Sequence, residues 1–116
     1  KDFIIKYKQN PIRSARTFAY MNMAIMDAGI SCWDTKYYYH YPRPIQTIPG
    51  FKTIAGTPNF PSYTSGHSVF SAAGAAVLGY IFPQEAELWF DAVVGTNQGR
   101  KVAQYSIERA KNDGAN

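Results

Sequence analysis

The sequence is poor in the residues from which disulfides and metal sites are built. It contains one cysteine, Cys32, and two histidines, His40 and His67, among 116 residues. A single cysteine excludes an internal disulfide and any cysteine-based zinc site, and two histidines leave little for a histidine-built metal site. We therefore expect no bound metal ion. A chain of this length has room for a single domain, residues 1–116, with one modest apolar core.

The sequence also lacks any block of like charge. Twelve lysines and arginines and eight aspartates and glutamates give a net charge of +4, and the basic residues are scattered along the chain. No zinc-finger or RNA-binding signature accompanies them, so we predict no nucleic-acid partner. A small anionic substrate accounts for the mild basic excess at least as well. The pattern of charge leaves the oligomeric state open.

Long apolar runs are absent as well. The first ten residues, KDFIIKYKQN, carry three lysines and lack the apolar stretch of a signal peptide. The most apolar segment, from Ser68 to Phe82, is shorter than the roughly 20 residues that cross a bilayer. We expect no transmembrane segment, and these residues leave the compartment open.

Apolar periodicity and proline positions predict a long first helix. Asn10 and Pro11 are typical of an N-cap and a first-turn proline, and Pro42 must end the helix after about Tyr38. Apolar residues then recur at steps of three and four, which predicts one buried face. The predicted face comprises Ile12, Ala15, Ala19, Met23, Met26, Ile30 and Trp33.

Two further helices are predicted. The segment from Ser68 to Phe82 is rich in small and apolar residues, which indicates a buried helix that ends at Pro83. The last helix is predicted from about Val93 to Asn112, with Gly114 in the position of a C-terminal cap. The residues before Ser68, from about Thr53, have loop composition. Since no strand-like alternation competes with these patterns, the predicted fold class is all-α, a helical bundle.

Two short motifs carry the chemistry. Lys36 is followed seven positions later by Arg43, and Ser65-Gly66-His67 stands directly before the buried helix. A helix N-terminus offers unpaired N–H groups to an anion, Gly66 lets the backbone approach it, and Ser65 adds a hydroxyl donor. Lys36 and Arg43 supply full positive charges. We predict that these four residues bind a tetrahedral oxyanion and that His67 donates or accepts a proton beside it.

Each motif also has an ordinary structural interpretation. Lys36 and Arg43 could be surface charges on either side of an aromatic turn, and Ser65 could simply cap a helix. Taken alone, His67 would more often be a structural first-turn residue. His40, among four tyrosines, is more readily explained by packing or surface exposure. The occurrence of both motifs in one short chain favours the oxyanion site.

The two motifs resemble those of a known superfamily. A lysine, six residues and Arg-Pro, followed downstream by Ser-Gly-His, are similar to the first two motifs of the type 2 phosphatidic acid phosphatase and vanadium-dependent haloperoxidase superfamily. The sequence from about Asn10 to Phe82 resembles the soluble bacterial members of this superfamily. The resemblance implies a helical bundle with an oxyanion site in its core. It also implies a periplasmic or secreted protein and a chain that is the C-terminal part of a larger one.

The resemblance implies a role for each motif residue. Lys36, Arg43, Ser65 and Gly66 would bind phosphate or vanadate, and His67 would be the catalytic acid–base residue. The leading expectation is an acid phosphatase that cleaves phosphomonoesters without a cofactor. The alternative is a haloperoxidase that uses vanadate as cofactor and hydrogen peroxide to oxidise halide.

One family motif is not found. The third motif, Ser-Arg, five residues and His, supplies a second arginine and a second histidine in relatives, but no histidine follows His67 here. The character of the sequence changes between Phe90 and Asp91. We hypothesise that a segment bearing this motif is missing at that point. If the 116 residues are the whole molecule, a second alternative follows, a catalytically dead anion-binding remnant.

Overall fold

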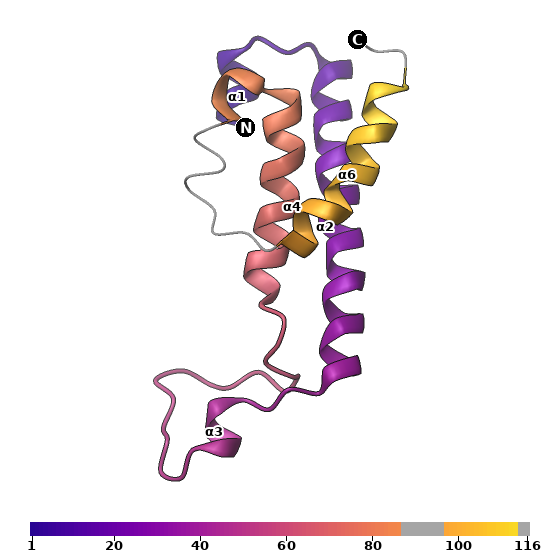
Figure 1. Ribbon diagram of the computed structural model, residues 1–116. Helices are drawn as coiled ribbons and strands as arrows, with labels where there is room; N and C mark the ends of the chain where they lie inside the picture. Colours follow the sequence, from indigo (N-terminus) through magenta and orange to yellow (C-terminus); the bar gives the residue numbers. More distant parts are fainter. Residues whose placement is uncertain (87–96, 114–116) are drawn as a thin grey trace.

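The computed structural model describes residues 1–86 and 97–113, and this part of the chain is helical without strands (Figure 1). The all-α helical bundle predicted from the sequence is confirmed. The helices are α1 (Asp2–Lys6), α2 (Pro11–Tyr39), α3 (Pro44–Thr47), α4 (Gly66–Ile81), the 3₁₀ helix η1 (Pro83–Glu85) and α6 (Asn97–Lys111).

Helix α2 begins and ends where local chemistry requires it. The Asn10 side chain accepts a hydrogen bond of 2.8 Å from the backbone N–H of Arg13, and Pro11 occupies the first turn. At the other end His40 adopts a left-handed conformation with φ of 48°, and Pro42 follows. A capped start and a proline-limited end were both predicted, and the observed helix ends one residue beyond the predicted Tyr38.

Helix α4 starts two residues earlier than predicted. Ser65 is its N-cap, with Oγ accepting from the backbone N–H of Ser68, and Pro83 opens η1 after the helix ends. Among the described residues, no helix has both the length and the apolarity needed to cross a bilayer. The predicted start of the last helix at residues 93–96, the cap at Gly114 and the hypothesised break near 90–91 lie outside the described residues.

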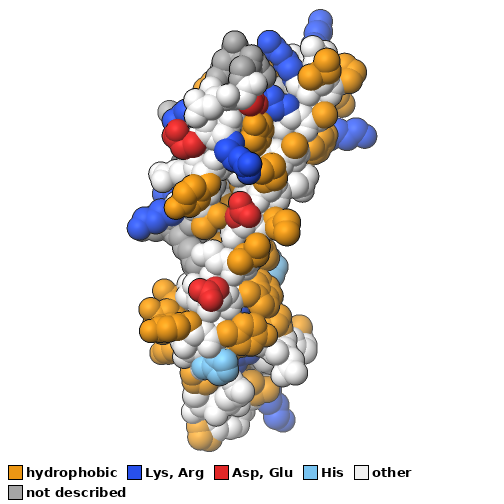
Figure 2. Space-filling view, turned by 90° about the vertical axis from the view of Figure 1, so that its right-hand side faces the viewer, with side chains coloured by type: hydrophobic (Ala, Val, Ile, Leu, Met, Phe, Trp, Pro, Cys, Tyr) orange, Lys and Arg blue, Asp and Glu red, His pale blue; other side chains and the backbone are white. Residues whose placement is uncertain are grey.

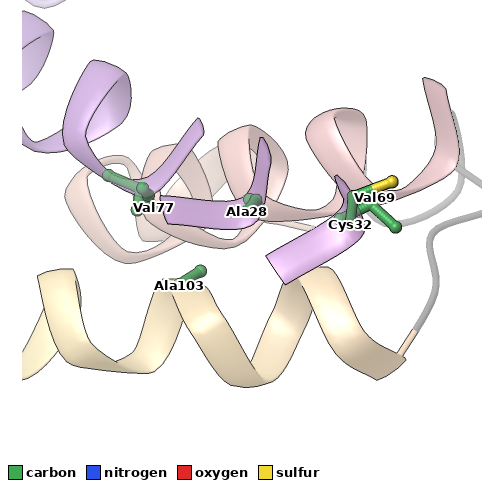
Figure 3. Close-up of a cluster of buried hydrophobic side chains, with 7 residues drawn as sticks. Ala28, Cys32, Val69, Val77 and Ala103 are labelled. Carbon is green, nitrogen blue, oxygen red and sulfur yellow. The ribbon is translucent and has the colours of Figure 1, made fainter. Parts of the chain in front are cut away.

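Helices α2, α4 and α6 pack side by side around a core of small residues (Figure 1, Figure 3). Small side chains let helix backbones approach closely, and the interior is then filled by contacts between neighbouring methyl groups. The buried cluster consists of Ala24, Ala28, Cys32, Val69, Ala73, Val77 and Ala103.

The buried face predicted for α2 is wrong for most of its residues, although Trp33 is half-buried and packs against the core. Ile12, Met26 and Ile30 are 80%, 68% and 62% exposed, and Figure 2 shows many hydrophobic side chains at the surface. The helix turns its small residues toward α4 and α6 instead, because bulky residues would hold those helices apart. The buried positions of α2 are Thr17, Ala24, Ala28, Cys32 and Lys36.

The segment between α2 and α4 lies beyond one end of the three-helix body (Figure 1). It runs from His40 to Ser65 and contains α3. The segment turns back on itself, and the backbone N–H of Ser62 donates a hydrogen bond of 2.9 Å to the carbonyl oxygen of Tyr41. The C-terminal end of α2 and the N-terminal end of α4 are thereby brought to the same end of the bundle.

Candidate oxyanion-binding site

One pocket brings all five predicted site residues together. It has a volume of about 330 Å³ and lies where α2, the connecting segment and α4 meet. Its lining includes Lys36, Arg43, Ser65, Gly66 and His67. The lysine comes from α2, the arginine from the connecting segment and the last three from the start of α4, so the fold joins motifs that the sequence separates.

Lys36 is the most buried charged group at the pocket. Its residue is 1% exposed, and its Nζ donates hydrogen bonds to the carbonyl oxygens of Pro61 (2.9 Å) and Ser62 (3.2 Å). The ammonium also lies 5.8 Å from the ring centroid of Trp33 and 5.2 Å from that of Phe60. Because an ammonium has three donors, one N–H remains for a ligand.

No carboxylate neutralises this lysine within residues 1–86 and 97–113. Burial lowers the pKa of Lys36 below its ordinary value; the nearby thiol of Cys32 opposes that shift, and the charge of Arg43 adds to it. The pocket therefore carries positive charge that an anion would neutralise. The ion pairs between described residues lie elsewhere, at Lys6–Glu85, Arg16–Asp113 and Glu108–Lys111.

Arg43 is held in place by its Nε atom. That atom donates a hydrogen bond of 2.8 Å to the carbonyl oxygen of Phe60, and the guanidinium carbon lies 5.0 Å from the centre of the same ring. The backbone N–H of Arg43 donates to Gln46 Oε1 at 2.8 Å. The two terminal guanidinium nitrogens have no hydrogen-bond partner in the described part of the chain, so they can bind paired oxygens of a ligand.

The start of α4 contributes donors and open space. Ser65 Oγ accepts from the backbone N–H and the hydroxyl of Ser68, which leaves its own hydroxyl proton as a donor. A Cβ atom on Gly66 would lie 3.6 Å from a ring atom of Trp33 and 3.8 Å from one of Phe70. Glycine therefore leaves a cavity wall without a side chain, directly beside the first unpaired N–H groups of the helix.

His67 lines the pocket and is exposed to solvent. No described residue hydrogen-bonds its imidazole. A ring that is free at both nitrogens can exchange a proton with a ligand held by the cations. The acid–base role of His67 stays a prediction.

Sequence reasoning missed the aromatic lining of the pocket. Trp33, Phe60 and Phe70 surround the cations, with ring centroids of Trp33 5.2 Å from Phe60 and 6.0 Å from Phe70. Trp33 was assigned to a buried helix face. The available signal was its position three residues before Lys36, which puts both side chains on one side of α2.

Comparison with protein families gives one match. Residues 16–55 match the family model of the VCPO second helical-bundle domain, a domain of the vanadium haloperoxidase family. The matched segment includes Lys36 and Arg43 but ends before Ser65-Gly66-His67. No curated protein and no solved structure matches the chain. Because the match is confined to about a third of the chain, it supports the relation to the superfamily loosely.

Proposed function

We propose that this pocket binds a tetrahedral oxyanion, phosphate or vanadate, as the substrate-binding part of a phosphatase or haloperoxidase. The observation that carries the proposal is the buried ammonium of Lys36, which faces the pocket with one free donor and no carboxylate partner among the described residues. Burial of an uncompensated charge is unfavourable, so it is typical of a site whose ligand supplies the opposite charge.

Each residue has a distinct part in the proposed binding. Lys36 and the fork of Arg43 would neutralise the charge of the anion, and the N–H of Gly66 and hydroxyl of Ser65 would fix its orientation. These groups are in place before the ligand arrives, so they would also stabilise charge that builds up during phosphoryl transfer. His67 would pass a proton to the leaving group.

The leading enzymatic function is phosphomonoester cleavage of the acid phosphatase type. The resemblance assigns attack on phosphorus to a histidine of the third motif, which the printed sequence does not contain. Binding is thus the part of the reaction that the chain's own residues support directly. Cleavage would need a nucleophile in addition to His67.

Haloperoxidase activity is the second candidate, and the match of residues 16–55 to a VCPO domain favours it. Vanadate is a tetrahedral oxyanion like phosphate, so the free donors of Lys36 and Arg43 suit either anion. Bound vanadate would activate hydrogen peroxide for halide oxidation. In that reaction Lys36 and Arg43 would hold the cofactor, and His67 would be the acid–base residue in the activation of peroxide.

A calorimetric titration of the 116-residue chain with phosphate and then vanadate tests the proposal. We expect saturable binding of one equivalent of either anion, with each displacing the other. Absence of binding to both would refute it. Hydrolysis of a phosphate ester would favour the phosphatase, whereas halide oxidation that requires both vanadate and peroxide would favour the haloperoxidase.

Phosphate affinity is expected to fall as the pH rises through the lowered pKa of Lys36. The bound anion stabilises the charged form of Lys36. Above the pKa that Lys36 has in the ligand-free protein, the lysine must therefore take up a proton each time an anion binds. The fall approaches about tenfold per pH unit. Calorimetry at a series of alkaline pH values below 10.5, the ordinary pKa of a lysine, measures the slope. A Lys36→Met variant should bind more weakly at a constant level, and a flat profile in the unchanged chain would contradict the prediction.

A further inference from the structure

A second pocket adjoins the oxyanion pocket. It has a volume of about 450 Å³ and shares Arg43, Pro58 and Phe60 with its neighbour. Its other side includes Tyr37, from the last turn of α2, and Tyr41, from the start of the connecting segment. We name it the aromatic pocket, after Tyr37, Tyr41 and Phe60. The two pockets therefore lie on either side of the same three residues, within the span of one small ligand.

The walls of the aromatic pocket are fixed by backbone interactions. The carbonyl oxygen of Phe60 accepts from Arg43 Nε at 2.8 Å, and that of Tyr41 accepts from the backbone N–H of Ser62 at 2.9 Å. The Nδ1 atom of His40 lies 2.7 Å from the carbonyl oxygen of Tyr37. The backbone that carries these rings is therefore held before a ligand binds, which reduces the entropy lost on binding.

The tyrosine rings of this pocket remain in water. Tyr37 is 54% and Tyr41 62% exposed, and both line the same pocket as Arg43. A flat ring placed between them would remove apolar surface from water and could stack on the tyrosines and on the guanidinium plane. A short alkyl group offers neither the area nor the stacking. The lining is thus suited to an aromatic group.

We propose that the aromatic pocket binds the ring of an aryl phosphate whose phosphoryl group lies between Lys36 and Arg43. The proposal rests on the oxyanion function and adds the class of substrate. Arg43 is the charged residue that lines both pockets. A phosphoryl group bound to it would therefore place the attached ring in the aromatic pocket. The same geometry accepts an aryl ester and leaves the phosphoryl group exposed to His67.

Three ligands that share a tetrahedral oxyanion test the proposal: inorganic phosphate, methylphosphonate and phenylphosphonate. Calorimetry on the 116-residue chain should give phenylphosphonate an affinity about threefold to tenfold higher than methylphosphonate. If phosphate and methylphosphonate bind and the phenyl group adds nothing, the aromatic pocket is refuted and the oxyanion site stands. If none of the three binds, both proposals fail.

A pair of tyrosine variants locates the ring. Tyr41→Ala keeps the backbone carbonyl that Ser62 uses, so the fold should persist while the preference for phenylphosphonate is lost and phosphate affinity is unchanged. Tyr38→Ala is the matched control, because Tyr38 is 81% exposed and lines neither pocket. A preference that survives Tyr41→Ala, or that disappears in Tyr38→Ala, would overturn the proposal.

Discussion

Replacement of Arg43 by alanine is expected to weaken phosphate binding by about 2 kcal/mol, or roughly thirtyfold. The guanidinium is anchored through Nε to the carbonyl oxygen of Phe60, so its two terminal nitrogens reach the pocket in a fixed direction. The variant loses both charge-assisted donors, and Lys36 alone then faces the anion. Calorimetric titration with phosphate measures the change, and a thermal melt reports whether the connecting segment is still folded.

Arg13→Ala provides the control for overall charge. Arg13 is exposed in the first turn of α2, outside the pocket, and its removal changes the net charge by the same amount. We expect its phosphate affinity to stay within about twofold of the unchanged chain, because exposed charges are screened by salt. An unchanged titration in Arg43→Ala, or an equal loss in both variants, would show that no specific arginine contact exists.

The two ends of α2 and the cap at Ser65 were predictable because they depend on neighbouring residues alone. Asn10 and Pro11 start α2 through a side-chain cap and a preset φ, and Pro42 prevents its continuation. Ser65 caps α4 in the same way. Such interactions are complete within one turn of chain, so the sequence contains all that is needed to predict them.

The buried face of α2 was not predictable in the same way, because it depends on which helices pack against it. Both the stripe that contains Ile12, Met26 and Ile30 and the stripe of small residues have helical spacing. The small residues are buried because α4 is itself lined with alanines and packs closely. Lys36 follows Ala28 and Cys32 at steps of four, so it lies on the same stripe and is buried with these small residues.

The five motif residues of the site were predictable, but its walls were not. Residue types and their order indicate Lys36, Arg43 and the Ser65-Gly66-His67 turn. The positions of Trp33 and Phe60 beside them depend on the path of the segment from His40 to Ser65. That path is set by contacts of Lys36 and Arg43 with backbone carbonyls, which no local pattern reveals.

Gly99→Ala is expected to lower the free energy of unfolding, because overpacking costs about 1–3 kcal/mol. A Cβ atom at this position would lie 2.3 Å from the carbonyl oxygen of Val69, and 3.1 Å from both its carbonyl carbon and the Cβ of Ala72. Since the nearest obstacles are backbone atoms of α4, α6 must move away, and the core around Ala103 opens. Alanine's better helix propensity, about 1 kcal/mol, offsets only part of this loss. Urea unfolding followed by circular dichroism measures it.

Gly74→Ala makes the matched comparison, since Gly74 is a buried helical glycine with a different neighbour. A Cβ atom there would lie 3.5 Å and 3.7 Å from two side-chain atoms of Ile25, which is ordinary contact. We expect this variant to be more stable than the unchanged chain by up to about 1 kcal/mol, because the gain in helix propensity is not opposed by a clash. The two substitutions are chemically identical, so opposite signs would locate the close approach of α6 to α4 at Gly99. Equal effects of the two would instead show that helix propensity alone governs both positions.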